Sequence, residues 1–347
     1  MTGNVVEQSC NILIVGGTGV GKSSLVNYLV GKNVAKIGVG KPVTSRDDIP
    51  AYNCTSDGIR LQLFDSWGIE ADKTDDWIGR IRKIIGKDGE DAVAWFHTVV
   101  YCISSGGQRF QRNDAEMIRF FKNEGFSIVI ALTKSDQVSE AISQKMLESL
   151  PKSIPAVVVS SGGMVRSGKT EPFGKDELIA KIAQQALKNL PKRVRRFALA
   201  RVDDWERDML RRLGRKDVSR FSNDDIESWI KVSASEFADH LGKDTDVFLA
   251  NECAILNVWA MRSLHDGSGI DVDVSVLKDS SSLSIGAALF GITFLPAVIV
   301  AGLIFGADWA REGLEKMIRK AAGQIRDVVN KKYGNTYEGT NELSASS

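Results

Sequence analysis

Short apolar runs separated by amphipathic stretches dominate the first half of the chain. Five short segments predict strands. Four of them are mainly apolar, at Asn11–Val15, His97–Ile103, Phe126–Leu132 and Ala156–Ser160, and the fifth, Ile59–Phe64, alternates apolar and polar residues. Helical segments lie between them, at Ser23–Val30, Asn113–Asn123 and Lys175–Leu190. Because strands and helices alternate, we predict an α/β domain over residues 9–190 with a mostly parallel, doubly wound sheet.

The pattern changes beyond Pro191, where strand-like runs stop and long helical periodicity begins. The segments that predict helices are Lys192–Leu213, a stretch from Ser222 or Asn223 to about Leu241, one from Asp244 or Thr245 to about Leu264, and the charged stretch Asp308–Tyr333. We therefore predict an all-α domain over residues 191–333 and a disordered polar tail over 334–347.

The predicted helical domain contains a hydrophobic segment, Leu283–Phe305, that has no charged residue. Its length is enough to cross a bilayer core of about 30 Å. Gly286, Gly291 and Pro296 divide it into two short helices or kink one helix. Two interpretations stay open at this point: contact with a membrane, and a hydrophobic hairpin buried among the protein's own helices.

A glycine-rich loop joins the first predicted strand to the first predicted helix. It has the pattern G-x-x-x-x-G-K-S and is followed by Ser24; its residues are Gly16, Gly17, Thr18, Gly19, Val20, Gly21, Lys22 and Ser23. In such a loop successive amides and the helix N-terminus face a phosphate chain. Lys22 is expected to reach the β- and γ-phosphates, and the Ser23 hydroxyl to bind Mg²⁺.

A second motif, Asp65-Ser66-Trp67-Gly68, follows the alternating strand. We expect Asp65 to hold Mg²⁺ through water and the amide of Gly68 to lie near the γ-phosphate. The loop Gly38–Thr44 lies between the two motifs, and Thr44 is the candidate for a second hydroxyl ligand of Mg²⁺. Together with Lys22, Thr44 and Gly68 are the residues predicted to act on the γ-phosphate.

A third motif, Thr133-Lys134-Ser135-Asp136, follows the fourth predicted strand and identifies the base. A carboxylate such as that of Asp136 offers two acceptors for the N1–H and 2-amino groups of guanine, whereas adenine has no matching donors on that edge. The wrong base would leave the carboxylate unpaired at a cost of roughly 1–3 kcal/mol. After the next strand, a backbone amide at Ser160 or Ser161 is expected to contact guanine O6.

A second match to the phosphate-loop pattern occurs at Gly163–Thr170. Pro172 and Gly174 follow closely, so no helix can continue from Lys169 and Thr170 to present its amides. We interpret this segment as a mobile loop beside the base pocket.

With these motifs in this order, residues 9–190 resemble a translation-factor-class P-loop GTPase domain. The glycine-rich loop is similar to those of septin, chloroplast-import, immunity-related and Era-like GTPases, some of which carry a helical C-terminal half. The resemblance implies binding of GTP and GDP, hydrolysis of GTP and a Mg²⁺ cofactor. Ile69 stands where Ras-type enzymes have the Gln that orients water, which implies slow unaided hydrolysis.

The loop Ser104–Arg112 contains Arg109 and Arg112. One interpretation is a catalytic arginine donated across a homodimer of G domains, and the other is a pair of solvated surface arginines.

Composition indicates in which cellular compartment the protein is located and which classes of partner it binds. The 347 residues carry a net charge of +1, with 4 cysteines that show no paired spacing and 3 histidines. This balance predicts reduced thiols, a cytoplasmic location and no nucleic-acid partner. The expected function is a GTPase switch whose helical region engages a membrane, peripherally or integrally, or a partner. The alternatives are a dynamin-like membrane-remodelling GTPase and a soluble ribosome-assembly GTPase.

Overall fold

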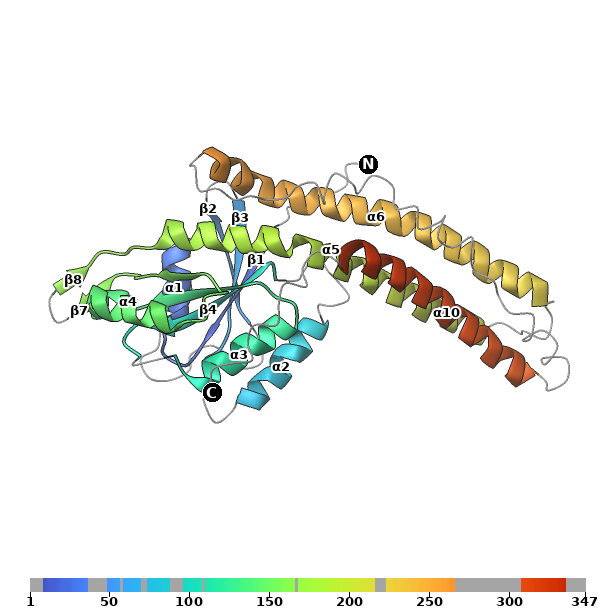
Figure 1. The fold of residues 1–347 in the computed structure, drawn as a ribbon, viewed down its shortest axis with the longest axis horizontal. Helices are drawn as coiled ribbons and strands as arrows, with labels where there is room; N and C mark the ends of the chain where they lie inside the picture. Colours follow the sequence, from blue (N-terminus) through green and yellow to red (C-terminus); the bar gives the residue numbers. More distant parts are fainter. Residues whose placement is uncertain are drawn as a thin grey trace. The chain divides into compact units, whose positions relative to one another are not determined.

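The computed structural model describes residues 9–36, 49–56, 59–69, 74–87, 96–107, 110–165, 168–215, 223–265 and 307–334. By its internal contacts the chain forms two compact units (Figure 1). The first comprises Met1–Leu190 and Asn251–Val272, and the second comprises Pro191–Ala250 and Asp273–Ser347.

A six-stranded sheet of order β2-β3-β1-β4-β5-β6 forms the centre of the first unit. All neighbouring strands are parallel except β2 and β3, which form an antiparallel pair at one edge. The strands are β1 (Cys10–Gly16), β2 (Ala51–Ser56), β3 (Ile59–Asp65), β4 (Thr98–Ser104), β5 (Ile128–Thr133) and β6 (Ala156–Val158). The predicted α/β class and the mostly parallel sheet are therefore confirmed.

Helices cover both faces of this sheet. They are α1 (Lys22–Val30), α2 (Thr74–Lys87), α3 (Arg112–Asn123), α4 (Glu140–Ser149) and the first part of α5 (Lys175–Arg215). Strand β1 supplies both cores, because Ile12 and Ile14 pack on one face while Leu13 and Val15 pack on the other. The first core includes residues of α1 and α5, and the second includes residues of α2 and α3. Burial on both faces explains why β1, β4 and β5 have near-continuous apolar sequences.

The end of helix α6 (Asn223–His265) belongs to the first unit. Leu256 of α6 is fully buried in the core that α1 and α5 share. The buried carboxylate of Glu252 lies 3.2 Å from Nε2 of His97, and Nδ1 of His97 accepts a hydrogen bond of 2.9 Å from the amide of Asn11. Since Nδ1 is an acceptor, Nε2 carries the proton that faces Glu252. The prediction of one helical domain over 191–333 therefore differs from the structure, because the described residues 251–265 belong to the unit that contains the sheet.

In the described part of the second unit there are three long helices: the part of α5 beyond Pro191, most of α6, and α10 (Ala307–Gly334). Rings stack between α5 and α6, with centroids 4.4 Å apart for Phe197 and Phe248 and 5.4 Å apart for Trp205 and Phe237. Helix α10 lies along α5 (Figure 1).

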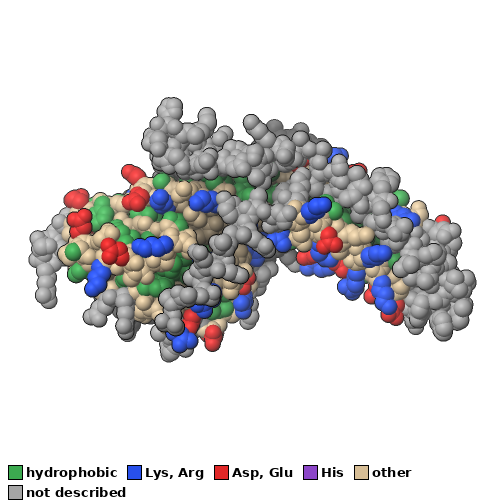
Figure 2. All heavy atoms as spheres, in the orientation of Figure 1, with side chains coloured by type: hydrophobic (Ala, Val, Ile, Leu, Met, Phe, Trp, Pro, Cys, Tyr) green, Lys and Arg blue, Asp and Glu red, His purple; other side chains and the backbone are tan. Residues whose placement is uncertain are grey.

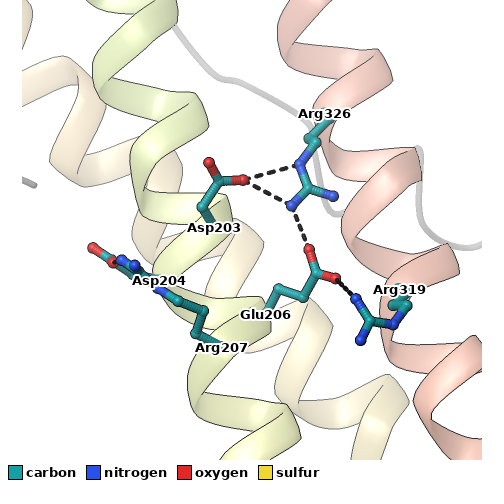
Figure 3. Close-up of polar contacts among 6 residues, drawn as sticks. All are labelled: Asp203, Asp204, Glu206, Arg207, Arg319 and Arg326. Carbon is teal, nitrogen blue, oxygen red and sulfur yellow. Dashed lines mark hydrogen bonds and ion pairs between the residues drawn. The ribbon is translucent and has the colours of Figure 1, made fainter. Parts of the chain in front are cut away.

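Ion pairs join α5 and α10 in the second unit (Figure 3). The Arg326 guanidinium donates to Asp203 at 2.7 Å and also to Glu206, and Arg319 lies 3.4 Å from Glu206. Glu206 is largely buried, with 12% of its side chain exposed, so its charge is only weakly screened by water. This cluster sets the register of α10 on α5.

Two helix boundaries differ from the prediction. Helix α5 continues through Pro191, where the sequence indicates a break. Helix α6 is one helix rather than two, and Thr245, expected to cap a new helix, instead donates its hydroxyl to the carbonyl of Leu241 at 2.6 Å. Such a bond to the preceding turn lets a buried threonine continue a helix.

No helix among the described residues is long and apolar enough to cross a membrane. The segment Leu283–Phe305 and the tail beyond Gly334 lie outside the described residues. On the face drawn in Figure 2, acidic and basic side chains are interspersed rather than sorted by sign.

Candidate functional site

The phosphate loop runs from the end of β1 into α1. Gly21 is the N-cap of α1 and adopts φ of 106°, a left-handed conformation that favours glycine. Gly21 has no side chain that could cap the amides of the first turn. The N-terminus of α1 therefore presents N–H groups and the positive end of the helix dipole, which suits an anion.

Lys22 folds its side chain back over the loop. Its ammonium donates to the carbonyls of Gly16 at 3.1 Å and Gly17 at 2.8 Å, and only 7% of the residue is exposed. Burial lowers the pKa of Lys22. The residue thus sits at the centre of the loop that it was predicted to serve, while Thr18 and Gly19 are exposed and Ser24 is half-buried.

Ser23 and Asp65 face each other across the loop. The Ser23 hydroxyl donates to Oδ2 of Asp65 at 2.7 Å. Among the described residues, no group donates a hydrogen bond to the buried Oδ1 of Asp65, and burial raises the pKa of this carboxyl. A hydroxyl and a carboxylate with an unsatisfied oxygen are hard oxygen donors of the kind that Mg²⁺ prefers. The donor set fits the predicted metal; Thr44, the third expected ligand, lies outside the described residues.

The segment after Asp65 is bonded directly to the phosphate loop. The amide of Ile69 donates to Gly16 at 3.1 Å, and the amide of Thr18 donates to the carbonyl of Ile69 at 3.2 Å. A Cβ at Gly68 would lie 2.3 Å from Oγ1 of Thr18, so only glycine permits this approach. The second motif therefore cannot move without changing the backbone contacts of the first.

Two tryptophans connect this segment to α2. Trp67 is buried, and its ring centroid lies 5.8 Å from that of Trp77 in α2. The indole N–H of Trp77 donates to the carbonyl of Trp67 at 3.3 Å. Neither α2 nor this contact was predicted from the sequence. The amphipathic pattern of Thr74–Lys87 is the signal that could have revealed the helix.

The third motif also contacts the phosphate loop. Thr133 donates its hydroxyl to the carbonyl of Val20 at 2.5 Å, and the ammonium of Lys134 donates to Gly19 at 2.6 Å. Lys134 adopts φ of 56°, which turns the chain into the short helix Ser135–Gln137. The buried hydroxyl of Ser135 donates to the carbonyl of Leu132 at 2.8 Å and lies 2.6 Å from that of Ser105.

Asp136 lies on the short helix and accepts a hydrogen bond of 2.9 Å at Oδ2 from the hydroxyl of Thr170. Thr170 was assigned to a mobile loop. In the structure it ends the hairpin formed by β7 (Gly163–Val165) and β8 (Gly168–Thr170), so the segment is a hairpin rather than a loop, while its place beside Asp136 agrees with the prediction. β-branched Val165 and Thr170 are the weak signal for this hairpin.

Ser160 and Ser161 lie beyond β6, which ends at Val158. The hydroxyl of the buried Ser160 accepts from the amide of Gly162 at 3.0 Å, and Ser161 is half-buried. Of the two candidate arginines, Arg109 lies outside the described residues. Arg112 is 90% exposed and pairs with Glu116 at 2.9 Å.

The comparisons with known proteins agree with this arrangement. Residues 11–134 match the family described as 50S ribosome-binding GTPase. That match includes the phosphate loop, the segment around Asp65 and the start of the base motif. Residues 11–134 are a P-loop GTPase domain.

Curated relatives of this G domain include bacterial GTPases. The chain is 27% identical over 176 residues to the probable GTP-binding protein EngB of Aquifex aeolicus, covering 49% of this chain and 88% of EngB. It is 23% identical over 269 residues to GTPase Era of Vibrio vulnificus, covering 76% of this chain and 77% of Era. The chain spans only 37% of the tRNA modification GTPase MnmE of Clostridioides difficile, at 25% identity.

Solved structures similar to the chain include Toc33 from Arabidopsis thaliana in complex with GDP and Mg²⁺, at 17% identity and a TM-score of 0.38, covering 52% of this chain and 84% of Toc33. Era in complex with MgGDPNP and a segment of 16S ribosomal RNA matches at 18% identity and a TM-score of 0.39, covering 56% of this chain and 67% of Era.

Gly68→Ala is expected to weaken GTP binding selectively. The added methyl group would collide with Thr18 and push the Gly68 amide away from the γ-phosphate position. We expect the Kd for GTP to rise about tenfold or more and that for GDP to rise by a smaller factor, because Thr18 belongs to the loop that would hold both nucleotides; titration with fluorescent nucleotides measures both. Gly79→Ala is the matched control, since a Cβ there meets no atom within 4 Å. Equal losses for GTP and GDP would contradict a γ-phosphate role for Gly68.

Proposed function

We propose that the protein binds GTP with Mg²⁺, hydrolyses it to GDP and phosphate, and acts as a nucleotide switch. The observation that carries this proposal is the Ser23–Asp65 pair, in which one oxygen of a buried carboxylate beside the phosphate loop receives no hydrogen bond from any residue that the structure describes. A buried anion without a full set of partners is costly, and a bound cation would remove that cost. The Asp136 carboxylate specifies guanine.

Lys22 and the amides of the loop would hold the phosphates and neutralise their charge. Mg²⁺, held by Ser23 and through water by Asp65, would withdraw charge from the β- and γ-phosphates. Thr44 and the amide of Gly68 would complete the contacts to the γ-phosphate. Hydrolysis removes the group that these two residues contact, so they would be released in the GDP state.

A structural change caused by loss of the γ-phosphate would be transmitted from the site through Gly68 and Trp67. Ile69 is bonded to the phosphate loop on both its amide and its carbonyl, and Trp67 is bonded to Trp77 of α2. A change at the γ-phosphate would therefore alter either the loop or the position of α2. We propose that this change controls how the helical region engages a membrane or a protein partner.

Unaided hydrolysis is expected to be slow. Ile69 is 8% exposed and packs in the core with Trp67 and Trp77, so an apolar, buried side chain follows Gly68. It has no group that can orient the attacking water. We propose that a second G domain supplies the missing stabilisation in a homodimer.

The guanine assignment predicts a change of base preference in Asp136→Asn. The amide can donate to the 2-oxo group of xanthine and cannot accept both guanine donors, so GTP affinity should fall by roughly tenfold to a hundredfold while affinity for xanthosine triphosphate rises. Competition with a fluorescent nucleotide measures both. Lys22→Ala is the control, because it should weaken both nucleotides without changing their ratio. An unchanged GTP preference in Asp136→Asn would show that Asp136 does not bind the base.

The dimer proposal predicts that GTP turnover per molecule rises with protein concentration. An arginine supplied in trans contributes about 10³–10⁵ in kcat. Arg109→Ala or Arg112→Ala should abolish the rise and leave GTP affinity intact, whereas Arg119→Ala, which removes an exposed arginine of α3, should keep it. Phosphate release measured over a wide concentration range is the test. A flat specific activity in the unmodified protein would exclude the dimer model.

The uncharged segment Leu283–Phe305 predicts nucleotide-dependent flotation with liposomes. A charge at Ala288 or Val298 would cost about 2.5–3.5 kcal/mol at the bilayer centre, so Ala288→Asp and Val298→Asp should reduce flotation without changing GTP affinity. Ala141→Asp, at an exposed position of α4, is the control. Absence of flotation for the unmodified protein in the apo, GDP and GTP-analogue states would favour a buried hairpin.

A further inference from the structure

The contact between Thr170 and Asp136 lies outside the motifs that define the site. The Thr170 hydroxyl is 2.9 Å from Oδ2 of Asp136 and 3.3 Å from the carbonyl of Gly163. A hydroxyl has one proton, and the shorter, charge-assisted bond to the carboxylate is the stronger of the two. Thr170 therefore donates to the carboxylate that is proposed to read the base.

The hairpin that carries Thr170 is held at its base. Ser160 and Phe173 exchange two backbone hydrogen bonds, of 3.1 and 3.0 Å. The amide of Gly162 donates to the Ser160 hydroxyl at 3.0 Å, and Gly163 pairs with Thr170 across the hairpin. Thr170 thus has a defined place relative to β6. Its hydroxyl is presented to Asp136 by the backbone rather than by a free loop.

This contact leaves room for a base. A carboxylate has about four lone-pair sites, and Thr170 uses one of them on Oδ2. Among the contacts of the described residues, the other site on Oδ2 and both sites on Oδ1 remain for the N1–H and the 2-amino group of guanine. Two parallel bonds to a planar ring require the carboxylate to lie in the plane of that ring. Because Asp136 is only half-buried, core packing alone does not fix its rotation.

We propose that Thr170 is a positioning residue for guanine specificity, which orients the Asp136 carboxylate so that both of its oxygens meet the base. The inference rests on the proposed binding of guanine nucleotides at this site. The hairpin β7–β8 would then be a part of the base site that none of the sequence motifs contains. A rotated carboxylate could no longer meet both donors of the base, and a comparison of guanine with inosine detects loss of the bond to the 2-amino group.

Inosine diphosphate separates orientation from general stability. Inosine keeps the N1–H of guanine and lacks the 2-amino group, so the ratio of GDP to IDP affinity reports whether the second bond is made. A purely structural role for Thr170 would weaken both nucleotides equally and leave this ratio unchanged. A role in orienting Asp136 would lower the ratio.

The test measures GDP and IDP affinities by calorimetry for the full chain and four variants. Thr170→Val removes the hydroxyl at nearly constant shape, and we expect it to lower GDP affinity about three- to tenfold and to reduce the GDP/IDP ratio by a similar factor. Thr170→Ala should repeat this effect, and Thr170→Ser should restore the ratio. Thr55→Val, at an exposed position of β2, should match the unmodified protein.

The outcomes distinguish this inference from the proposed function. If the unmodified protein prefers GDP to IDP and both Thr170→Val and Thr170→Ala retain its ratio, the inference is wrong and the proposed function stands. If the unmodified protein binds neither nucleotide, both are wrong. A lowered ratio in either variant with recovery in Thr170→Ser supports the inference, and circular dichroism confirms that the variant compared is folded.

Discussion

The carbonyl oxygens of the phosphate loop are held from several directions, and the rest of the site depends on this constraint. Lys22 holds the carbonyls of Gly16 and Gly17, while Lys134 and Thr133 hold those of Gly19 and Val20. With these carbonyls turned toward protein donors, the opposite edge of the backbone is left for its N–H groups. An anion site results from the neighbours of the loop as much as from its glycines.

The same bonds bring three motifs that lie far apart in the sequence to one edge of the sheet. Asp65 is the last residue of β3, Thr133 is the last residue of β5, and the phosphate loop follows β1. Parallel strands share an orientation, so their carboxyl ends and the residues that follow meet at one edge. Thr133, Lys134 and Asp65 are therefore all bonded to the loop, and a ligand that orders one of them would restrain the others.

The long helices α5, α6 and α10 are held by contacts of charged side chains rather than by bonds to the phosphate loop. In the first unit, the buried Glu252 of α6 meets His97 at the start of β4, close to the Asn11 amide of β1. In the second unit, the partly buried Glu206 gathers Arg319 and Arg326 onto α5. Removing the partner of a buried carboxylate leaves that carboxylate without compensation, so both contacts favour a single register of their helices. A switch that acts on α6 would have to work against the first of them.

The sequence by itself determined the α/β class, the order of its motifs, and the identity of the residues around the phosphate loop. It could do so because strand burial and the glycine-rich turn are local properties, read from residues within one short segment. Strand β2 was missed because it is a half-exposed edge strand whose partner is β3. Helix α2 was also missed, although its amphipathic pattern is visible in the sequence. Tertiary structure alone decided that α6 continues past Thr245 and buries Leu256 beside the sheet. It also decided that Thr170, 34 residues from Asp136, would contact its carboxylate. These contacts join residues far apart in the chain, and they follow from the path of the backbone through the folded protein rather than from any periodicity.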